Sequence, residues 1–253
     1  VNYETLDRTY FENKATLNSE YVFGQFEWFI KEKWNVLAGF RYDNHHQYQS
    51  QFSPKIGVNY KWNDNFSLKT SVGYGYKAPD LRQLYFDFTN SAVGYTVLGY
   101  NVAEDKLAIL QSQGQILFTN GFDFSNPLKP ESSVNFNFGG YYKKNKWSFD
   151  YNFFYNTIKN LIDTRAIAQK TNGQNVFTYF NIDEIFTYGI EINSNYKFTD
   201  DLKISFGYQY LIAKDKSVIK AIDNGEVFAR DPETLQSFQI KKSNYIGLLN
   251  RSK

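Results

Sequence analysis

The feature that most constrains this chain is the strict alternation of apolar and polar residues along several long stretches. Between positions 33 and 43 the apolar residues Trp34, Val36, Ala38, Phe40 and Tyr42 recur at every second position, and Leu37 is the one large apolar residue between them. Because successive side chains of a β-strand point to opposite faces, this period of two predicts strands with one apolar and one polar face. The same pattern recurs at 20–30, 53–62, 66–76, 134–142, 147–155, 188–198 and 202–210. The sequence therefore predicts an all-β chain of about eight strands, each about 9–11 residues long.

The connections between these strands differ sharply in length. Short polar turns are expected at 31–33, 63–65, 143–146 and 199–201, where each joins two strands as a hairpin. The other connections are mostly long and cover 77–132, 157–177 and the chain from 211 onward, with only 44–50 being short. Short turns at one end and long loops at the other are typical of an antiparallel meander with one functional end.

Aromatic residues gather beside the short turns. The pairs are Trp28 and Trp34, Trp62 and Phe66, Tyr142 and Trp147, and Tyr196 and Phe198. An aromatic girdle of this kind, with strands of about ten residues, is typical of a transmembrane antiparallel β-barrel with long extracellular loops. A soluble β-sandwich would also alternate, so it stays open as the alternative. The connection 77–132 is too long for the rim of a small barrel, which favours part of a larger one.

Composition narrows the possible functions. The chain has no Cys, which excludes disulfide scaffolds and thiol chemistry. Lys and Arg total 28 against 26 Asp and Glu, so the formal charge of +2 gives no long-range attraction to nucleic acid. Val1 stands where an initiator Met would be expected, so we expect a mature or partial product.

The sequence predicts no enzyme, because the metalloprotease, serine-hydrolase and dithiol motifs are all missing. The two imidazoles, His45 and His46, stand near Asp43 in the connection 44–50, which is the one arrangement that an outer-membrane phospholipase or protease could use. We predict no catalytic residues, no metal site and no covalently bound cofactor.

Candidate ligand-binding residues lie in two of the connections. His45 and His46 are candidates in the first, as haem or metal ligands, although a solvated loop position is the favoured interpretation of both. Tyr85, Tyr95 and Tyr100 are candidates in 77–132, where phenol rings could stack on a ligand or contact a metal chelate. The stretch 102–113 is amphipathic, so we expect a short helix that helps to cover a ligand entrance, or an ordered loop that touches no ligand.

Two motifs flank the long connection. Tyr76, Lys77, Ala78 and Pro79 end the fourth strand, and Asn126, Pro127 and Leu128 precede the fifth. Proline cannot donate to a strand ladder, so both motifs have a plain structural use at strand ends, while a direct contact with a ligand or partner stays open for 76–79. Together with 52–57 and with 188–191, their order along the chain resembles that of TonB-dependent outer-membrane receptors.

The resemblance implies where the chain belongs. It implies that residues 1–253 form a partial, mid-barrel domain of a barrel of about 22 strands, with a plug domain that is not present in this chain. It implies location in the outer membrane of a Gram-negative bacterium, contact with outer-membrane lipid, and energy from a TonB–ExbB–ExbD complex acting through the plug. A surface lipoprotein is a further candidate partner, and no nucleic acid is expected.

The two motifs with the stretch 88–95 are most similar to the haem and haemoglobin receptor branch and its cobalamin-receptor relatives. Those haem receptors carry a ligating His between the two motifs, whereas residues 80–125 contain none. The resemblance therefore implies active uptake of an iron chelate, either haem or a ferric siderophore. Uptake of cobalamin or another nutrient, or a passive porin or adhesin barrel, is the alternative.

Overall fold

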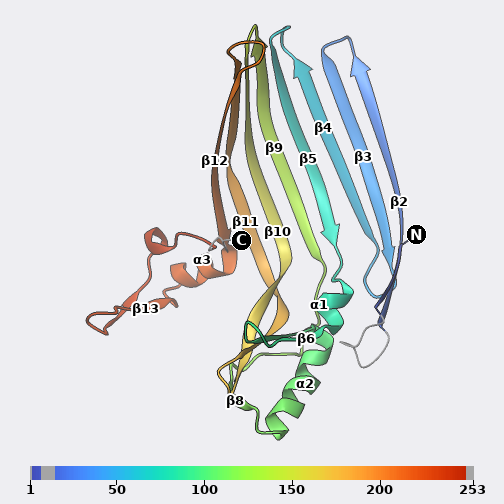
Figure 1. Ribbon diagram of the computed structural model, residues 1–253. Coiled ribbons are helices and arrows are strands. Elements are labelled where there is room, and N and C mark those ends of the chain that lie inside the picture. The colour runs from blue at the N-terminus through green and yellow to red at the C-terminus, as the bar shows by residue number, and fades with distance from the viewer. Residues whose placement is uncertain (1, 7–14, 249–253) are drawn as a thin grey trace.

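Eight long antiparallel strands form one curved wall (Figure 1). The computed structural model describes residues 2–6 and 15–248, and side chains over 15–248. The long strands are β2 Ala15–Ile30, β3 Trp34–His45, β4 Gln51–Lys61, β5 Phe66–Lys77, β9 Glu131–Lys144, β10 Trp147–Lys170, β11 Asn175–Lys197 and β12 Lys203–Asp215. Each pairs with the next in the order of the chain. The predicted all-β fold and the eight predicted strands are confirmed, with most strands longer than expected.

The shorter elements lie near the end of the wall opposite the tight turns, and β1 pairs there with residues 15–19 of β2 at the amino-terminal edge. They are β1 Asn2–Leu6, α1 Leu81–Tyr85, β6 Asp87–Asn90, β7 Tyr95–Leu98, α2 Tyr100–Ser112, β8 Ile116–Thr119, α3 Lys216–Asp223, β13 Phe228–Arg230, β14 Ser237–Gln239 and the 3₁₀ turn η1 Lys242–Asn244. None of the helices in the described ranges is both long and apolar enough to cross a bilayer.

The strand register brings the apolar residues onto one face of the wall. A single cross-strand row consists of Trp28, Val36, Val58, Thr70, Phe138, Phe153, Ile190 and Tyr210. Large side chains on this face are widely exposed, as at Phe26 with 65% and Trp28 with 56% of their surface accessible. The alternation seen in the sequence therefore builds a continuous apolar surface rather than a buried core.

The opposite face is polar. Its matching row consists of Asn35, Asn59, Lys69, Gly139, Asn152, Glu191 and Gln209. Hydrogen bonds run along this row, because the amides of Asn152 and Gln209 both donate to Glu191, the latter at 2.9 Å. This face also bears a hollow of about 470 Å³. Polar side chains that bond to one another around an open hollow are suited to a hydrated interior.

The four predicted tight turns are confirmed and lie together at one end of the wall, at the top of Figure 1. Lys31, Glu32 and Asn145 take positive φ values of 48°, 55° and 52°, as tight hairpin turns require. Aromatic rings pack beside these turns, with the ring centroids of Trp34 and Tyr60 4.3 Å apart.

The prediction of a long loop at 157–177 was wrong. Strands β10 and β11 continue through this stretch and meet at a short turn at 171–174, so the hairpin projects well beyond its neighbours. Segment 77–132 packs against the projection: β7 pairs in parallel with β11 at Tyr95 and Asn175, and β8 pairs with β10 at Thr119 and Ala168. The long loop is therefore a folded unit that covers the hairpin.

The buried core lies between this unit and the ends of the wall strands β2, β10 and β11. One cluster contains Leu17, Leu81, Leu84, Tyr100, Leu128 and Ile162, and the other contains Leu98, Ala103, Leu107, Ile167, Ala168 and Val176. Helix α2 contributes to both clusters, which confirms the expected helix. Burial of these apolar side chains holds the loop unit against the strand ends.

Candidate functional site

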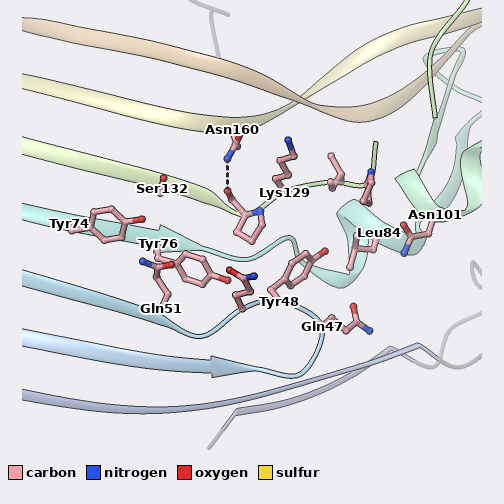
Figure 2. Close-up of a pocket in the computed structure, with 14 residues that line it drawn as sticks. Gln47, Tyr48, Gln51, Tyr74, Tyr76, Leu84, Asn101, Lys129, Ser132 and Asn160 are labelled. Carbon is pink, nitrogen blue, oxygen red and sulfur yellow. Dashed lines mark hydrogen bonds between the residues drawn. The ribbon is translucent and has the colours of Figure 1, made fainter. Parts of the chain in front are cut away.

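A pocket opens where β4 and β5 part. Their ladder ends at Lys55 and Gly73, although β4 begins at Gln51 and β5 runs on to Lys77. The space between the two strand ends belongs to a pocket of about 550 Å³, a size suited to a small-molecule ligand. Figure 2 shows the connection 46–50 on one side of it and segment 127–130 on the other.

Tyrosines and carboxamides dominate the lining of this pocket. The residues are Gln47, Tyr48, Gln49, Gln51, Tyr74, Tyr76, Leu84, Asn101, Pro127, Leu128, Lys129, Pro130, Ser132 and Asn160. Carboxamides and phenol hydroxyls both donate and accept hydrogen bonds. We refer to this cavity as the tyrosine–carboxamide pocket.

Two of the tyrosines are held in unusual surroundings. Burial, with the nearby phenols of Tyr85 and Tyr76, raises the pKa of Tyr48 to about 12, so its hydroxyl stays protonated at neutral pH. The ring of Tyr48 also lies against His45, with ring centroids 5.1 Å apart. The Tyr76 hydroxyl is buried and has no hydrogen-bond partner in the described part of the chain.

The motif at 76–79 directs the chain from the wall into the loop unit. The Lys77 ammonium pairs with Glu131 at 3.2 Å, which joins the ends of β5 and β9. Pro79 is fully buried, and Asp80 then caps α1 by accepting from the Gln83 N–H at 2.7 Å. The prediction that Pro79 follows the end of a strand is confirmed, because β5 ends at Lys77 and α1 begins at Leu81.

The motif at 126–128 is anchored by contacts from distant strands. The Tyr100 hydroxyl donates to the Asn126 carbonyl at 2.5 Å, and Leu128 is buried in the first core cluster. Next to them, the Asn181 side chain bonds both backbone groups of Lys129, at 2.8 and 2.9 Å. Pro127 and Lys129 are thereby fixed at the wall of the pocket.

A second pocket of about 500 Å³ lies on the other side of segment 126–129. Tyr100, Asp123, Arg165 and Asp183 are among its lining residues. Its charged groups are of both signs, so the segment separates a nearly uncharged pocket from a charged one.

The residues proposed from the sequence are dispersed. His45 accepts from the Gln47 N–H at 3.3 Å, while the backbone N–H of His46 donates to the Asn18 carbonyl of β2 at 3.2 Å. Tyr85 packs on the first core cluster. Tyr95 lies in β7, and Tyr100 is core and lines only the second pocket. None of the five lines the tyrosine–carboxamide pocket among the residues that the structure describes.

Three residues of the two sequence motifs, Tyr76, Pro127 and Leu128, do line the pocket. Sequence reasoning missed the other residues that build it, above all Tyr48, Gln49, Asn160 and Asn181. One local signal was present in the sequence. The connection 44–50 holds no Lys, Arg, Asp or Glu, and its run Gln47, Tyr48 and Gln49 supplies neutral hydrogen-bonding side chains. No comparable local signal marks Asn160 or Asn181, whose contacts join separate strands. No group of three or more His, Cys, Asp or Glu side chains in the described ranges is arranged to hold a metal ion.

Comparison with known proteins agrees with this architecture. Residues 2–248 match the family model described as TonB dependent receptor-like, beta-barrel. The chain is 27% identical over 200 residues to the iron-regulated outer membrane virulence protein of Vibrio cholerae, covering 76% of this chain and 27% of that protein. It is 23% identical over 186 residues to the ferrienterobactin receptor of Escherichia coli, covering 71% of this chain and 22% of that protein.

Solved structures share the fold. The siderophore receptor PirA from Pseudomonas aeruginosa superposes with a TM-score of 0.64 at 19% identity, over 84% of this chain and 38% of that one. The chain thus spans about a quarter of the length of the curated relatives it matches. With a family model matched across nearly all of its residues and a two-faced antiparallel wall, the chain belongs to the TonB-dependent receptor-like β-barrel family.

Proposed function

We propose that this chain is part of the barrel of a TonB-dependent outer-membrane receptor that actively imports a ferric siderophore. The observation that carries the proposal is the two-faced wall, apolar on one side and hydrogen-bonded and polar on the other, which ends in a ligand-sized pocket at its loop end. Family membership and the names of the relatives, which include a ferrienterobactin receptor, support the same function.

In this proposal the apolar face contacts lipid of a Gram-negative outer membrane. The row that contains Val58 lies in the bilayer, the tight turns face the periplasm, and the loop unit faces the outside. The polar face surrounds a plug that another part of the protein provides, and 1–253 is a portion of the barrel. Because the outer membrane has no nucleotide supply, the energy comes from TonB–ExbB–ExbD through that plug. The proposed activity is transport, and no residue is assigned a catalytic role.

Haem is the second candidate ligand. The observation that favours it is the packing of His45 on Tyr48, because an imidazole or a phenolate can bind haem iron. Siderophores are preferred because four of the relatives are named as receptors for enterobactin or siderophores. Cobalamin uptake has no supporting contact in the described part of the chain, and a passive porin would have no use for a ligand-sized pocket at its loop end.

The test is nutrient uptake by cells that produce the full-length receptor as their sole receptor of this type. Radioiron would be offered as a ferric siderophore or as haem, and radiocobalt as cobalamin. We expect saturable uptake of a ferric siderophore only. Uptake of haem alone, or of cobalamin alone, would contradict the proposed substrate class.

A further inference from the structure

The charge of the tyrosine–carboxamide pocket limits the ligands that it can hold. Of its fourteen lining residues, Lys129 alone is charged. Lys129 also lines the second pocket, and in Figure 2 its side chain extends away from the three tyrosines. A ligand in this pocket therefore meets mainly neutral donors and acceptors.

The segments of the chain around the pocket do not add basic side chains that could pair with an anionic ligand. Residues 46–51 contain no Lys, Arg, Asp or Glu, and 78–130 contain three basic residues against five acidic ones. The basic residues concentrate instead at the tight turns, where 31–33, 61–65, 143–146 and 197–203 hold eight Lys against four Asp and Glu. The field of this chain therefore does not draw a multiply charged anion toward the pocket.

The charge of a ferric chelate depends on its donor groups. Three catecholates, each doubly deprotonated, leave a net charge of minus three on the ferric complex, whereas three hydroxamates, each singly deprotonated, neutralise the metal. Moving a trianion into a partly buried site without paired cations is costly, whereas a neutral complex needs only hydrogen bonds and contact with rings.

One buried group in the pocket lacks a partner that such a ligand could supply. The Tyr76 hydroxyl is shielded from solvent and makes no hydrogen bond within the described ranges. In Figure 2 its ring points toward the connection that carries Tyr48. Buried polar atoms are normally satisfied, so an unpaired hydroxyl at a pocket wall indicates a position for a ligand oxygen or amide.

We propose that the tyrosine–carboxamide pocket binds an electrically neutral ferric chelate of the trihydroxamate class, through the hydroxyls of Tyr48 and Tyr76 and the amides of Gln49 and Gln51. This rests on the proposed function, and it separates the chain from relatives whose names specify enterobactin. The neutral complex fills the pocket between the parted strands, with its carbonyl oxygens accepting from the phenols and carboxamides.

The test is a binding titration of the full-length receptor, purified in detergent, with a ferric trihydroxamate and, separately, with a ferric tricatecholate. Quenching of the intrinsic fluorescence of the receptor reports binding. We expect the trihydroxamate to bind at least about tenfold more tightly. Tyr76→Phe should weaken that binding by about 3- to 10-fold, the effect of one neutral hydrogen bond. Because the hydroxyl has no hydrogen-bond partner in the described part of the chain, its removal should leave the melting temperature unchanged.

Two further variants make the outcome decisive. Gln49→Lys adds a cation, so it should tighten tricatecholate binding and leave trihydroxamate binding equal or weaker. Tyr208→Phe, on the apolar face, is the matched control and should change neither affinity. Tighter binding of the tricatecholate by the unaltered receptor, or full trihydroxamate affinity in Tyr76→Phe, would overturn this inference while leaving siderophore uptake intact. A receptor that binds neither ferric chelate would overturn the proposed function as well.

Discussion

The side chain of Asn181 pairs with the backbone of Lys129 in both directions. The Lys129 N–H donates to Asn181 Oδ1 at 2.8 Å, and Asn181 Nδ2 donates back to the Lys129 carbonyl at 2.9 Å. The same amide also donates to the Asn160 carbonyl at 2.7 Å. Asn160 itself has a φ of 54°, which an asparagine tolerates better than most residues do. One side chain of β11 thus holds together the segment and the strand that border the pocket.

Replacing Asn181 should loosen this wall of the pocket. Asn181→Ala removes three hydrogen bonds, so we expect the local free energy of opening at 126–131 to fall by about 1–3 kcal/mol. Amide hydrogen exchange at 126–131 measures this local free energy of opening. Asn181→Asp keeps the acceptor for the Lys129 N–H and loses both donors, so it should give an intermediate change. Unaltered exchange in Asn181→Ala would show that the contact does not hold the segment.

The two faces of β4 should tolerate charge very differently. Val58 lies in the apolar row, and Asn59 lies in the polar one. Val58→Arg should lower the free energy of unfolding in lipid by about 2–4 kcal/mol, because the charge enters hydrocarbon. Asn59→Arg should cost far less, because its side chain meets the hydrated face. Refolding titrations in vesicles compare the two, and equal losses would mean that the apolar face does not contact lipid.

Removing most of the long connection should spare the wall and abolish uptake. Deleting 86–120 keeps both flanking motifs and every long strand, so barrel assembly should persist as heat-resistant migration on a gel. It also removes Leu98, Ala103 and Leu107, which exposes Ile167 and Val176 on the projecting hairpin. We therefore expect protease sensitivity near 160–177 and the loss of high-affinity uptake.

Deletion of the hairpin 228–239 serves as the control for this experiment. Its two short strands form a sheet of their own and line neither pocket beside segment 126–129. Uptake should survive the control deletion. If uptake also survives the deletion of 86–120, the loop unit takes no part in binding.

Alkaline pH should reveal the shielded phenol of Tyr48. Its pKa is about 12 in the folded chain, whereas an exposed tyrosine titrates near 10. The unfolded chain therefore loses this proton first as the pH rises, so the contribution of Tyr48 to stability is complete below pH 10 and declines between about pH 10 and 12. Ultraviolet difference spectra of the native receptor and of Tyr48→Phe, recorded as the pH is raised, would measure the pKa of Tyr48. Titration of Tyr48 together with the exposed tyrosines would mean that the pocket is open to solvent there.

The wall could be predicted from sequence because one physical rule governs it throughout. Within the stretches from Trp34 in β3 to Tyr210 in β12 that form the wall, apolar residues recur at every second position, and the strand register keeps them on one face. The hairpin at 157–177 was not predicted because Ile162, Ile167 and Ala168 are buried under the loop unit. Apolar residues therefore occur on both faces of the strand, and the apolar–polar alternation that indicates a strand is lost. The burial of this hairpin comes from residues of segment 77–132, which is separate from the hairpin in the sequence.

The candidate site was predicted poorly for a related reason. Tyr100 looked available as a loop tyrosine, yet Leu128 and Ile162 bury it in a core that forms only after folding. The pocket itself depends on the parting of β4 and β5 and on the contact between Asn181 and Lys129. Neither leaves a local trace in the sequence, since each joins residues on separate strands.

The central claim, active import by an energised receptor, is tested most directly by uptake of a radioiron-labelled ferric siderophore. The rate would be measured in otherwise identical cells with and without TonB, each producing the full-length receptor at equal surface abundance. We predict saturable accumulation that requires TonB and stops when the proton gradient is dissipated, while binding to the cell surface persists. Equal, non-saturable entry in both strains would contradict the claim and identify a passive pore instead.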